Sequence, residues 1–363
     1  MRALRVKATD PSRKVMREAV RVLLEGGIVG FPTETVYGLA ADASNPDARA
    51  KLYSAKGRNA EKACAYLLPT RESLTQYLPG LPPLAERLAD AFWPGPVTLV
   101  VPDPDGVLVG LRLPSETLPR VLAREAGTPL LQTSANRSGA PAALNAAAVA
   151  AAVGKHVDLI LDSGRSPGGR ASSVVHCDDR RFRILRSGAV PESEILRAAT
   201  DLYVVACTGN ICRSPLGEAL LRHEASRLLR CESDEVVGHG FRFASCGTMG
   251  LPGEPASEHS VMTGAELGVD ITQHRSRPLS VPLLREAKVV YALARNHVNL
   301  LQPHFKEDPK KLQLLSPDGE DIQDPIGCSL RIYRRVARQI NEACRARMEE
   351  ILAKDPRVTG IRA

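Results

Sequence analysis

The sequence predicts an α/β protein in two domains, a twisted-sheet α/β domain followed by a domain with a doubly wound parallel sheet. Its 363 residues exceed the roughly 100–200 residues typical of one domain. Short apolar runs alternate with helical patterns in both halves. A loop that carries two cysteines and an arginine, residues 207–215 (CTGNICRSP), lies past the middle of the chain, between an apolar run and a helical pattern.

The composition is that of an ordinary soluble protein. Aromatic residues make up only 4%, so we expect a largely aliphatic core. We see no apolar run long enough to span a membrane and no signal peptide, and therefore expect a cytoplasmic protein without a membrane partner. The eight cysteines form no Cys-x-x-Cys pair, which argues against zinc and favours reduced thiols. The net charge of +7 fits RNA, nucleotide or phosphate ligands, or a simple solubility balance.

The first half, residues 1–190, reads as one domain. A helical pattern over 11–25 ends at Gly26-Gly27. We expect strands at 28–31, 63–68, 97–101, 107–113, 130–133, 159–161, 173–176 and 182–185, with helices between them that include 84–91 and the alanine-rich 142–153.

The second half begins after a break at residues 188–192. We place a linker at 191–201, a second domain at 202–353 and a tail at 354–363. Its expected strands are 202–206, 241–245, 289–294 and 311–315, and its expected helices are 216–229, 257–267, 296–301 and 329–352. This alternation is typical of a doubly wound parallel sheet.

The 207–215 loop has the chemistry of a phosphate trap beside a nucleophile. Backbone N–H groups in such a loop, together with the start of the next helix, bind anions and favour a thiolate at Cys207. Arg213 can hold two phosphate oxygens in a fork, and Gly209 lets the backbone turn close to the ligand. Asp324, before Pro325, is a candidate general acid for the leaving group.

The second half closely resembles the low-molecular-weight protein phosphatase family, through residues 207–215, 245–248, 268–277 and 324–327. The resemblance implies that Cys207 is the nucleophile, Arg213 the phosphate ligand and Asp324 the general acid. It also implies a network that shapes the loop, formed by Asn210, Ser214, Ser245 and His274, and a redox partner of Cys207 at Cys212. The resemblance implies neither a metal nor a cofactor for this half, and it implies a phosphorylated protein as the substrate.

The substrate class depends on two positions. Ile326 stands where tyrosine-type members usually carry an aromatic residue, and the stretch 324–333 is closer to bacterial arginine phosphatases. Ile211, in contrast, is the tyrosine-type residue at a position where arginine phosphatases typically have threonine. We rank phosphotyrosine ahead of phosphoarginine. An arsenate reductase and a redox sensor that uses Cys207 and Cys212 remain the alternatives for this half.

The first half carries cations and polar loop residues in a fixed order. Lys56, Arg58 and Arg186 can hold phosphates, and Ser134, Asn136 and Ser138 can orient them. The sequence has no Gly-x4-Gly-Lys-Ser/Thr motif, so we expect any ATP site to differ from a P-loop.

This ordered set resembles the Sua5/YrdC family of threonylcarbamoyl-AMP synthases over residues 11–190. Those enzymes join L-threonine, bicarbonate and ATP and release pyrophosphate, and their product feeds the t6A modification of tRNA. The resemblance implies ATP contacts at Lys56, Arg58, Ser134, Asn136, Ser138 and Arg186, and threonine contacts at Thr35, Arg112 and Ser172. It implies Mg²⁺ as the partner of ATP, held mainly by phosphates, and tRNA or proteins of the t6A pathway as further partners.

The sequence departs from the family pattern beside this proposed site. Asn59 replaces a proline, Lys62 stands where His or Asn is common, and Ala63-Cys64 replace Pro-Leu; Ser115-Glu116 also depart after Arg112. A nucleotide-binding or double-stranded-RNA-binding module fused to a phosphatase is therefore the alternative interpretation of the whole chain.

Overall fold

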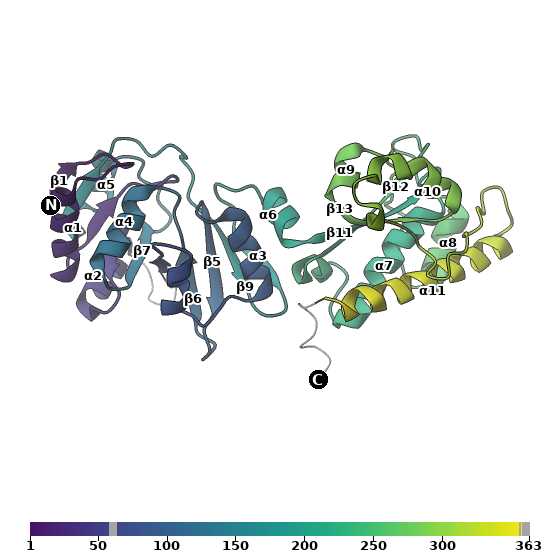
Figure 1. The fold of residues 1–363 in the computed structure, drawn as a ribbon, viewed down its shortest axis with the longest axis horizontal. Coiled ribbons are helices and arrows are strands. Elements are labelled where there is room, and N and C mark those ends of the chain that lie inside the picture. Colours follow the sequence, from purple (N-terminus) through teal and green to yellow (C-terminus); the bar gives the residue numbers. More distant parts are fainter. Residues whose placement is uncertain (58–63, 356, 358–363) are drawn as a thin grey trace. The chain divides into compact units, whose positions relative to one another are not determined.

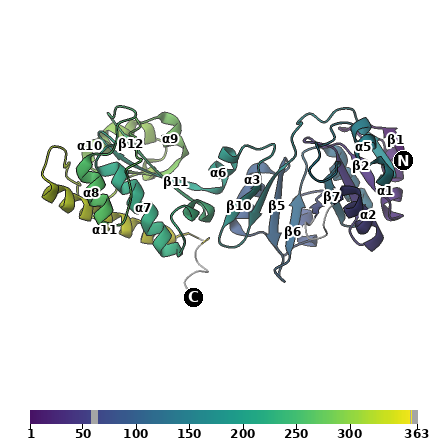
Figure 2. The same cartoon turned by 180° about the vertical axis from the view of Figure 1, so that it is seen from behind.

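The computed structural model describes residues 1–57, 64–355 and 357. The chain forms two compact units, Met1–Ala199 and Thr200–Ala363, each a mixture of helices and strands (Figure 1). Figure 2 shows the same elements from behind. Within the described residues, none of the helices combines the length and the apolarity that a bilayer crossing requires.

The first unit is built on a mixed sheet with the strand order β1-β8-β2-β3-β7-β4-β6-β5-β9-β10. The strands are β1 (Arg2–Arg5), β2 (Val29–Phe31), β3 (Gly38–Asp42), β4 (Ala65–Leu67), β5 (Val97–Pro102), β6 (Leu108–Arg112), β7 (Leu130–Ser134), β8 (Leu159–Asp162), β9 (Ser173–Cys177) and β10 (Phe182–Arg186). The helices are α1 (Arg13–Leu24), α2 (Pro46–Lys56), α3 (Pro83–Phe92), α4 (Thr117–Ala126), α5 (Ala146–Val153) and α6 (Glu192–Ala199).

Successive side chains of the central strands point to opposite faces of this sheet, and apolar side chains therefore lie on both faces. Leu159 and Leu161 of β8 pack into one core cluster with buried residues of α1 and α4. Ile160, between them, faces the opposite cluster with residues of α2 and α5. Because successive side chains of a strand point to opposite faces, both faces need helical cover, and the helices supply it.

A third core cluster joins α3 and α6 to strands β5, β6, β9 and β10. Residues 191–201, expected to be a linker, contain helix α6, whose Ile195 and Ala199 are fully buried in this cluster. The four-residue spacing puts these two side chains on one face of the short helix, and Leu196 and Ala198 also pack against the cluster. The helix therefore belongs to the first unit.

Strand β3 differs from expectation, because no strand was predicted between residues 31 and 63. Its five residues are all buried, so it lacks the polar and apolar alternation that marks a half-exposed strand. It pairs antiparallel with β2 and with β7, which fixes residues 33–37 next to the end of β7.

The second unit has a parallel sheet with the order β12-β11-β13-β14. Its strands are β11 (Asp201–Cys207), β12 (Phe241–Gly247), β13 (Ala287–Ala292) and β14 (Leu312–Leu314). Its helices are α7 (Arg213–Leu229), α8 (Glu258–Glu266), α9 (Val281–Glu286), α10 (Arg295–Leu301) and α11 (Leu330–Ala353).

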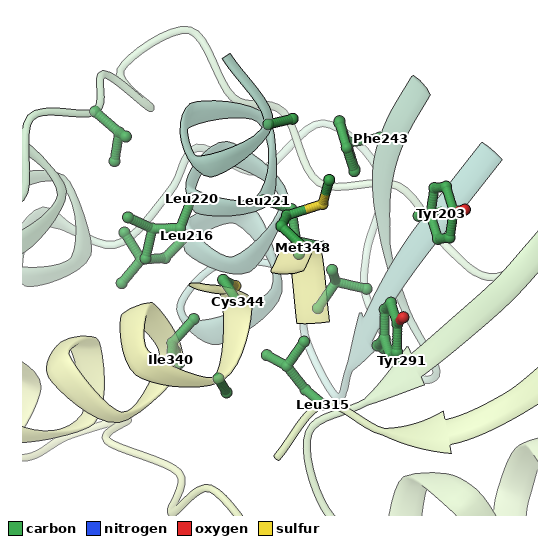
Figure 3. Close-up of a cluster of buried hydrophobic side chains, with 14 of the residues drawn as sticks. Tyr203, Leu216, Leu220, Leu221, Phe243, Tyr291, Leu315, Ile340, Cys344 and Met348 are labelled. Atoms are coloured by element: carbon green, nitrogen blue, oxygen red, sulfur yellow. The ribbon is translucent and has the colours of Figure 1, made fainter. Parts of the chain in front are cut away.

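Helices cover both faces of this sheet, which makes it doubly wound as predicted. Tyr203 and Val205 of β11 face a cluster with α7 and α11, part of which is drawn in Figure 3. Leu202 and Val204 face the opposite cluster with α9 and α10. The strand order reverses around β11, so the loops after β11 and β13 flank the crevice in which such sheets bind ligands.

Two residues of the expected C-terminal tail pack against the start of β11. Arg357 donates to Asp201 Oδ2 at 2.7 Å, and its guanidinium lies 4.6 Å from the ring centre of Phe241. Asp355 is buried and pairs with the same arginine. Residues 356 and 358–363 lie outside the described part of the chain.

We expect Leu88→Ala to destabilise the first unit by about 2–5 kcal/mol, because Leu88 is fully buried in the cluster that borders Trp93. Trp93 is the sole tryptophan of the sequence, so its fluorescence during urea denaturation reports this unit. Asp90→Ala is the control; its side chain is 72% exposed and we expect a change below about 1 kcal/mol. Equal effects of the two substitutions would contradict the described core.

Candidate functional site

The 207–215 loop connects the end of a buried strand to the start of a helix. Cys207 ends β11, and Arg213 begins α7. The Cys207 sulfur lies 2.9 Å from Ser214 Oγ and accepts from the Asn210 backbone N–H at 3.3 Å. Asn210 has φ of +55°, a left-handed conformation that folds the loop back over the thiol. The nucleophile predicted from the sequence thus lies within hydrogen-bond distance of the Ser214 hydroxyl and the Asn210 backbone N–H.

The residues predicted to shape the loop form a connected network. The Asn210 amide donates to Ser214 Oγ and to Ser245 Oγ, both at 2.9 Å. His274 Nε2 donates to the Asn210 carbonyl at 2.8 Å. Ser245 Oγ donates in turn to Glu218 Oε2 at 2.8 Å. Glu218 was not predicted as a member of this network. It lies four residues after Ser214 on α7, and this spacing, which puts both side chains on one face of the helix, could have indicated its role.

Arg213 and Asp324 are brought together from positions far apart in the sequence. Arg213 is buried, its Nη2 donates to Asp324 Oδ2, and its Nη1 donates to the Ile322 carbonyl at 2.9 Å. Its Nε is buried without a hydrogen-bond partner. The Asp324 side chain is 40% exposed. A fork with one unsatisfied donor and a partly exposed carboxylate can reorganise around an incoming oxyanion.

His297 is a neighbour of the loop that the sequence reasoning missed. It follows β13 on α10 and is fully buried, and its Nε2 lies 2.9 Å from Thr208 Oγ1. This contact joins the loop after β11 to the helix that follows β13. Burial, with the nearby Arg213 guanidinium, lowers the pKa of His297 to about 4, so the ring is neutral near pH 7. Its position just after the strand predicted at 289–294 could have indicated that His297 lies near the site.

The remaining predicted residues of this half surround the loop. Cys212 is a buried free thiol whose sulfur lies 3.5 Å from the Tyr333 hydroxyl. Burial and this thiol raise the pKa of Tyr333 to about 12. Ile326 is 61% exposed and Met249 is 76% exposed, and the backbone of Met249 is bonded to Thr208. Apolar side chains thus stand exposed on two segments next to the loop.

In the first unit, Lys56 gathers the predicted phosphate-binding residues. It ends α2 and is only 3% exposed. Its ammonium donates to Ser134 O at 2.7 Å, to Ser134 Oγ at 3.1 Å and to Asn136 Oδ1 at 3.1 Å. The backbone N–H of Ser138 donates to Lys56 O at 2.9 Å. Arg58, predicted to act with Lys56, lies outside the described residues.

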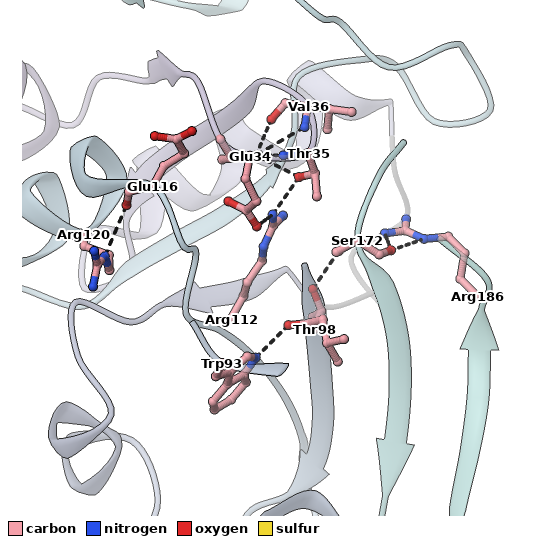
Figure 4. A network of polar contacts seen from close by, with 12 residues as sticks. Glu34, Thr35, Val36, Trp93, Thr98, Arg112, Glu116, Arg120, Ser172 and Arg186 are labelled. Atoms are coloured by element: carbon pink, nitrogen blue, oxygen red, sulfur yellow. Dashed lines mark hydrogen bonds and ion pairs between the residues drawn. The ribbon is translucent and has the colours of Figure 1, made fainter. Parts of the chain in front are cut away.

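Thr35 and Arg112, predicted to contact one ligand, are in direct contact (Figure 4). Arg112 ends β6, and its Nη2 donates to Thr35 Oγ1 at 2.7 Å and to Glu34 Oε1 at 2.8 Å. Thr33 Oγ1 organises the turn, since it accepts from Thr35 N at 3.2 Å and donates to Val36 O at 2.6 Å. Glu34 was not singled out from the sequence.

Ser172 and Arg186 form a third group. Arg186 donates to the Ser172 carbonyl from Nη2 at 2.7 Å, and Thr98 Oγ1 lies 2.9 Å from Ser172 Oγ. Thr98, Ser172 and Arg186 lie on or beside β5, β9 and β10, which are consecutive in the sheet and next to the strand of Arg112. The sheet therefore aligns the predicted threonine and nucleotide contacts in neighbouring strands.

These donors match anions better than they match a metal ion. The predicted residues of the first unit offer cations, hydroxyls and amides, which bind phosphate and carboxylate oxygens. Within the described residues there is no group of three or more His, Cys, Asp and Glu side chains that could hold a metal. A Mg²⁺ ion carried by ATP fits this set only as a partner of the phosphates.

Comparison with known proteins identifies both halves. A family model for Sua5, YciO and YrdC proteins, described as telomere recombination, matches residues 21–188. The model described as low molecular weight phosphotyrosine protein phosphatase matches residues 202–357. The putative threonylcarbamoyl-AMP synthase of Mycobacterium leprae is 35% identical over 208 residues, which cover 54% of this chain and 92% of that protein.

Two further matches differ in coverage. The threonylcarbamoyl-AMP synthase of Bacillus subtilis is 36% identical over 209 residues, which cover 55% of this chain and 60% of that protein, so the chain spans less than two thirds of this relative. The solved YwlE arginine phosphatase from Geobacillus stearothermophilus is 26% identical and covers 42% of this chain and 94% of that chain, with a TM-score of 0.37. The chain belongs to the threonylcarbamoyl-AMP synthase family through its first unit, and its second unit matches the model of the low molecular weight phosphotyrosine protein phosphatases.

Proposed function

We propose that the second unit hydrolyses phosphorylated protein side chains in two steps. The Cys207 thiolate attacks phosphorus and forms a phosphocysteine, while Asp324 gives its proton to the leaving group. Asp324 then takes a proton from water, which attacks the phosphocysteine and releases phosphate. The observation that carries this proposal is the cluster of Ser214, Asn210 and the start of α7 around the Cys207 sulfur.

The ion pair of Arg213 and Asp324 is the resting form of this site. A phosphate above Cys207 offers Arg213 two oxygens in the plane of its fork, and the Nε without a partner supplies a further donor. Once the arginine turns to the phosphate, Asp324 is free to hold the proton that the leaving group needs. Cys207 and Cys212 are both free thiols, and the Cys212 sulfur lies 3.5 Å from the Tyr333 hydroxyl.

We propose phosphotyrosine, ahead of phosphoarginine, as the substrate. Ile211 is an apolar residue beside the turn at Gly209, and Met249 and Ile326 add exposed apolar surface near the loop. An aromatic ring buries its faces against such side chains. A guanidinium, by contrast, needs acceptors to replace its water.

We propose that the first unit makes threonylcarbamoyl-AMP and pyrophosphate from L-threonine, bicarbonate and ATP, a step that supplies tRNA modification. Lys56, Ser134, Asn136, Ser138 and Arg186 hold the nucleotide; Thr35, Arg112 and Ser172 hold threonine. Arg58 completes the nucleotide set from outside the described residues. The observation that carries this proposal is the buried Lys56 ammonium, held by loop acceptors that phosphate oxygens can replace. Mg²⁺ would lower the charge of the ATP phosphates, and we assign it no side-chain ligand.

Substitutions of Cys207 and Asp324 test the roles of nucleophile and general acid separately. We expect Cys207→Ser to abolish hydrolysis of an aryl phosphate, because a hydroxyl at this position is not ionised near pH 7. Asp324→Asn keeps the hydrogen bond from Arg213 but not the proton, and should lower kcat by roughly 10²–10⁴. Unchanged turnover in the serine variant would falsify the assignment.

Substrate choice is tested by comparing phosphotyrosine and phosphoarginine peptides. We expect Ile211→Thr to shift the ratio of the two kcat/KM values toward phosphoarginine by at least about tenfold, since the hydroxyl provides an acceptor for a guanidinium. Ile211→Val keeps a branched apolar side chain and should leave the ratio unchanged. A wild-type enzyme that prefers phosphoarginine would reverse our ranking.

Synthase activity is tested by pyrophosphate release from ATP. In the wild-type chain we expect release to require both L-threonine and bicarbonate. Lys56→Ala should lower the rate by about 10²-fold, because it removes a buried cation from the phosphates. Lys155→Ala, an exposed lysine in the same unit, is the control. Release that is independent of threonine, or binding of double-stranded RNA without ATP turnover, would favour a binding module instead.

A further inference from the structure

We propose that Glu34 is a further catalytic residue of the first unit: its carboxylate holds the α-ammonium group of the amino-acid substrate and accepts a proton from it. This inference rests on the proposed synthase function and adds a residue to it. Arg112 and Glu34 form an ion pair in which the side chains are only 9% and 14% exposed. Each side chain keeps one buried atom without a partner, Nε of Arg112 and Oε2 of Glu34.

The two unpartnered atoms define the chemistry of the ligand. Leaving a charged donor and a charged acceptor buried without partners costs free energy, so a ligand that satisfies both binds more tightly. A free α-amino acid offers a carboxylate for Arg112 and an ammonium for Glu34. A nucleotide phosphate offers only the anionic part. The pair therefore selects a zwitterion, which is the form of L-threonine near neutral pH.

The Glu34 backbone is fixed in place before any ligand binds. Its carbonyl accepts from the Gly168 N–H at 3.0 Å, and the next residue, Thr35, is bonded to both Thr33 and Arg112. A Cβ atom at Gly168 would lie 2.5 Å from the Glu34 carbonyl oxygen, so the approach of the 164–170 loop requires glycine there. A carboxylate held in this way loses little conformational freedom when it accepts a hydrogen bond.

Figure 4 shows which other carboxylate lies nearby. Glu116 is drawn in the same view, and its backbone carbonyl accepts from Arg120 at 3.3 Å. No hydrogen bond joins the Glu116 side chain to Arg112 among the described residues, whereas Glu34 accepts directly from that guanidinium. Of these two acids, Glu34 is therefore the one that the structure places against Arg112.

A proton acceptor at this position serves the first chemical step. The ammonium gives one proton to Glu34 and becomes a neutral amine. The amine lone pair attacks the carbon of bicarbonate, a C–N bond forms, and a C–O bond breaks with loss of water. Amine and bicarbonate thus give a carbamate and water, and the Glu34 proton passes to solvent. An ammonium has no lone pair, so this step needs a base.

The opposite role for Glu34 is competition with the substrate. Its carboxylate lies on Arg112, where a substrate carboxylate would bind, so it could block the site instead of serving it. The two roles predict opposite signs. If Glu34 competes, removing its charge strengthens threonine binding; if it holds the ammonium, removing its charge weakens binding.

The test titrates the full-length chain with L-threonine and with 3-hydroxybutyrate, which lacks the α-ammonium. We expect Glu34→Gln, which can still accept from Arg112, to weaken threonine binding by about tenfold or more and to leave 3-hydroxybutyrate unchanged or tighter. The KM for threonine should rise while that for ATP stays constant. The rate of pyrophosphate release should now increase with pH as more threonine carries a free amine.

Controls separate this role from misfolding and from failure of the proposed function. Glu125→Gln, an exposed acid in the same unit, should behave as wild type, and Glu34→Asp should retain part of the preference for threonine. Unchanged Trp93 fluorescence shows that each variant is folded. Equal or tighter threonine binding by folded Glu34→Gln overturns the inference alone. A wild-type chain that neither binds threonine nor releases pyrophosphate overturns the synthase proposal, and this inference with it.

Discussion

Both units depend on one constraint, that polar atoms buried where strands end must find hydrogen-bond partners. In the second unit the Asn210 amide meets this constraint for the thiol loop by bonding Ser214 and Ser245 together. In the first unit Lys56 does the same for the loop after β7. Asn210 and Lys56 each bond to residues on other elements, so each site exists only when its sheet has formed.

The same constraint explains why the arginine of each site forms an ion pair within the protein when no ligand is bound. Arg213 pairs with Asp324, and Arg112 pairs with Glu34, because a buried guanidinium without a carboxylate would be costly. Each pair still leaves one guanidinium nitrogen unsatisfied. An anionic ligand can therefore replace or extend the internal pair at a smaller free-energy cost than it would meet at a fully bonded arginine.

How far the sequence predicted the fold depended on the burial of each element. β11 was recognised from its apolar run, and α11 from its helical periodicity over a long stretch. β3 was missed because burial on both faces removes the alternation of polar and apolar residues. α6 was missed because a helix of only eight residues gives a short periodic pattern. His297 and Glu218 were missed because their partners, Thr208 and Ser245, lie on other elements.

The sequence by itself determined the chemistry of each half: a thiol and an arginine on a strand-to-helix loop, and cations and hydroxyls in a fixed order along the first unit. Local spacing sets the first of these, since residues 207–215 are consecutive. Only the tertiary structure decided which charges meet. Arg213 finds Asp324, and Arg112 finds Glu34, through the order of strands in each sheet, and strand order is a long-range property that no local pattern contains.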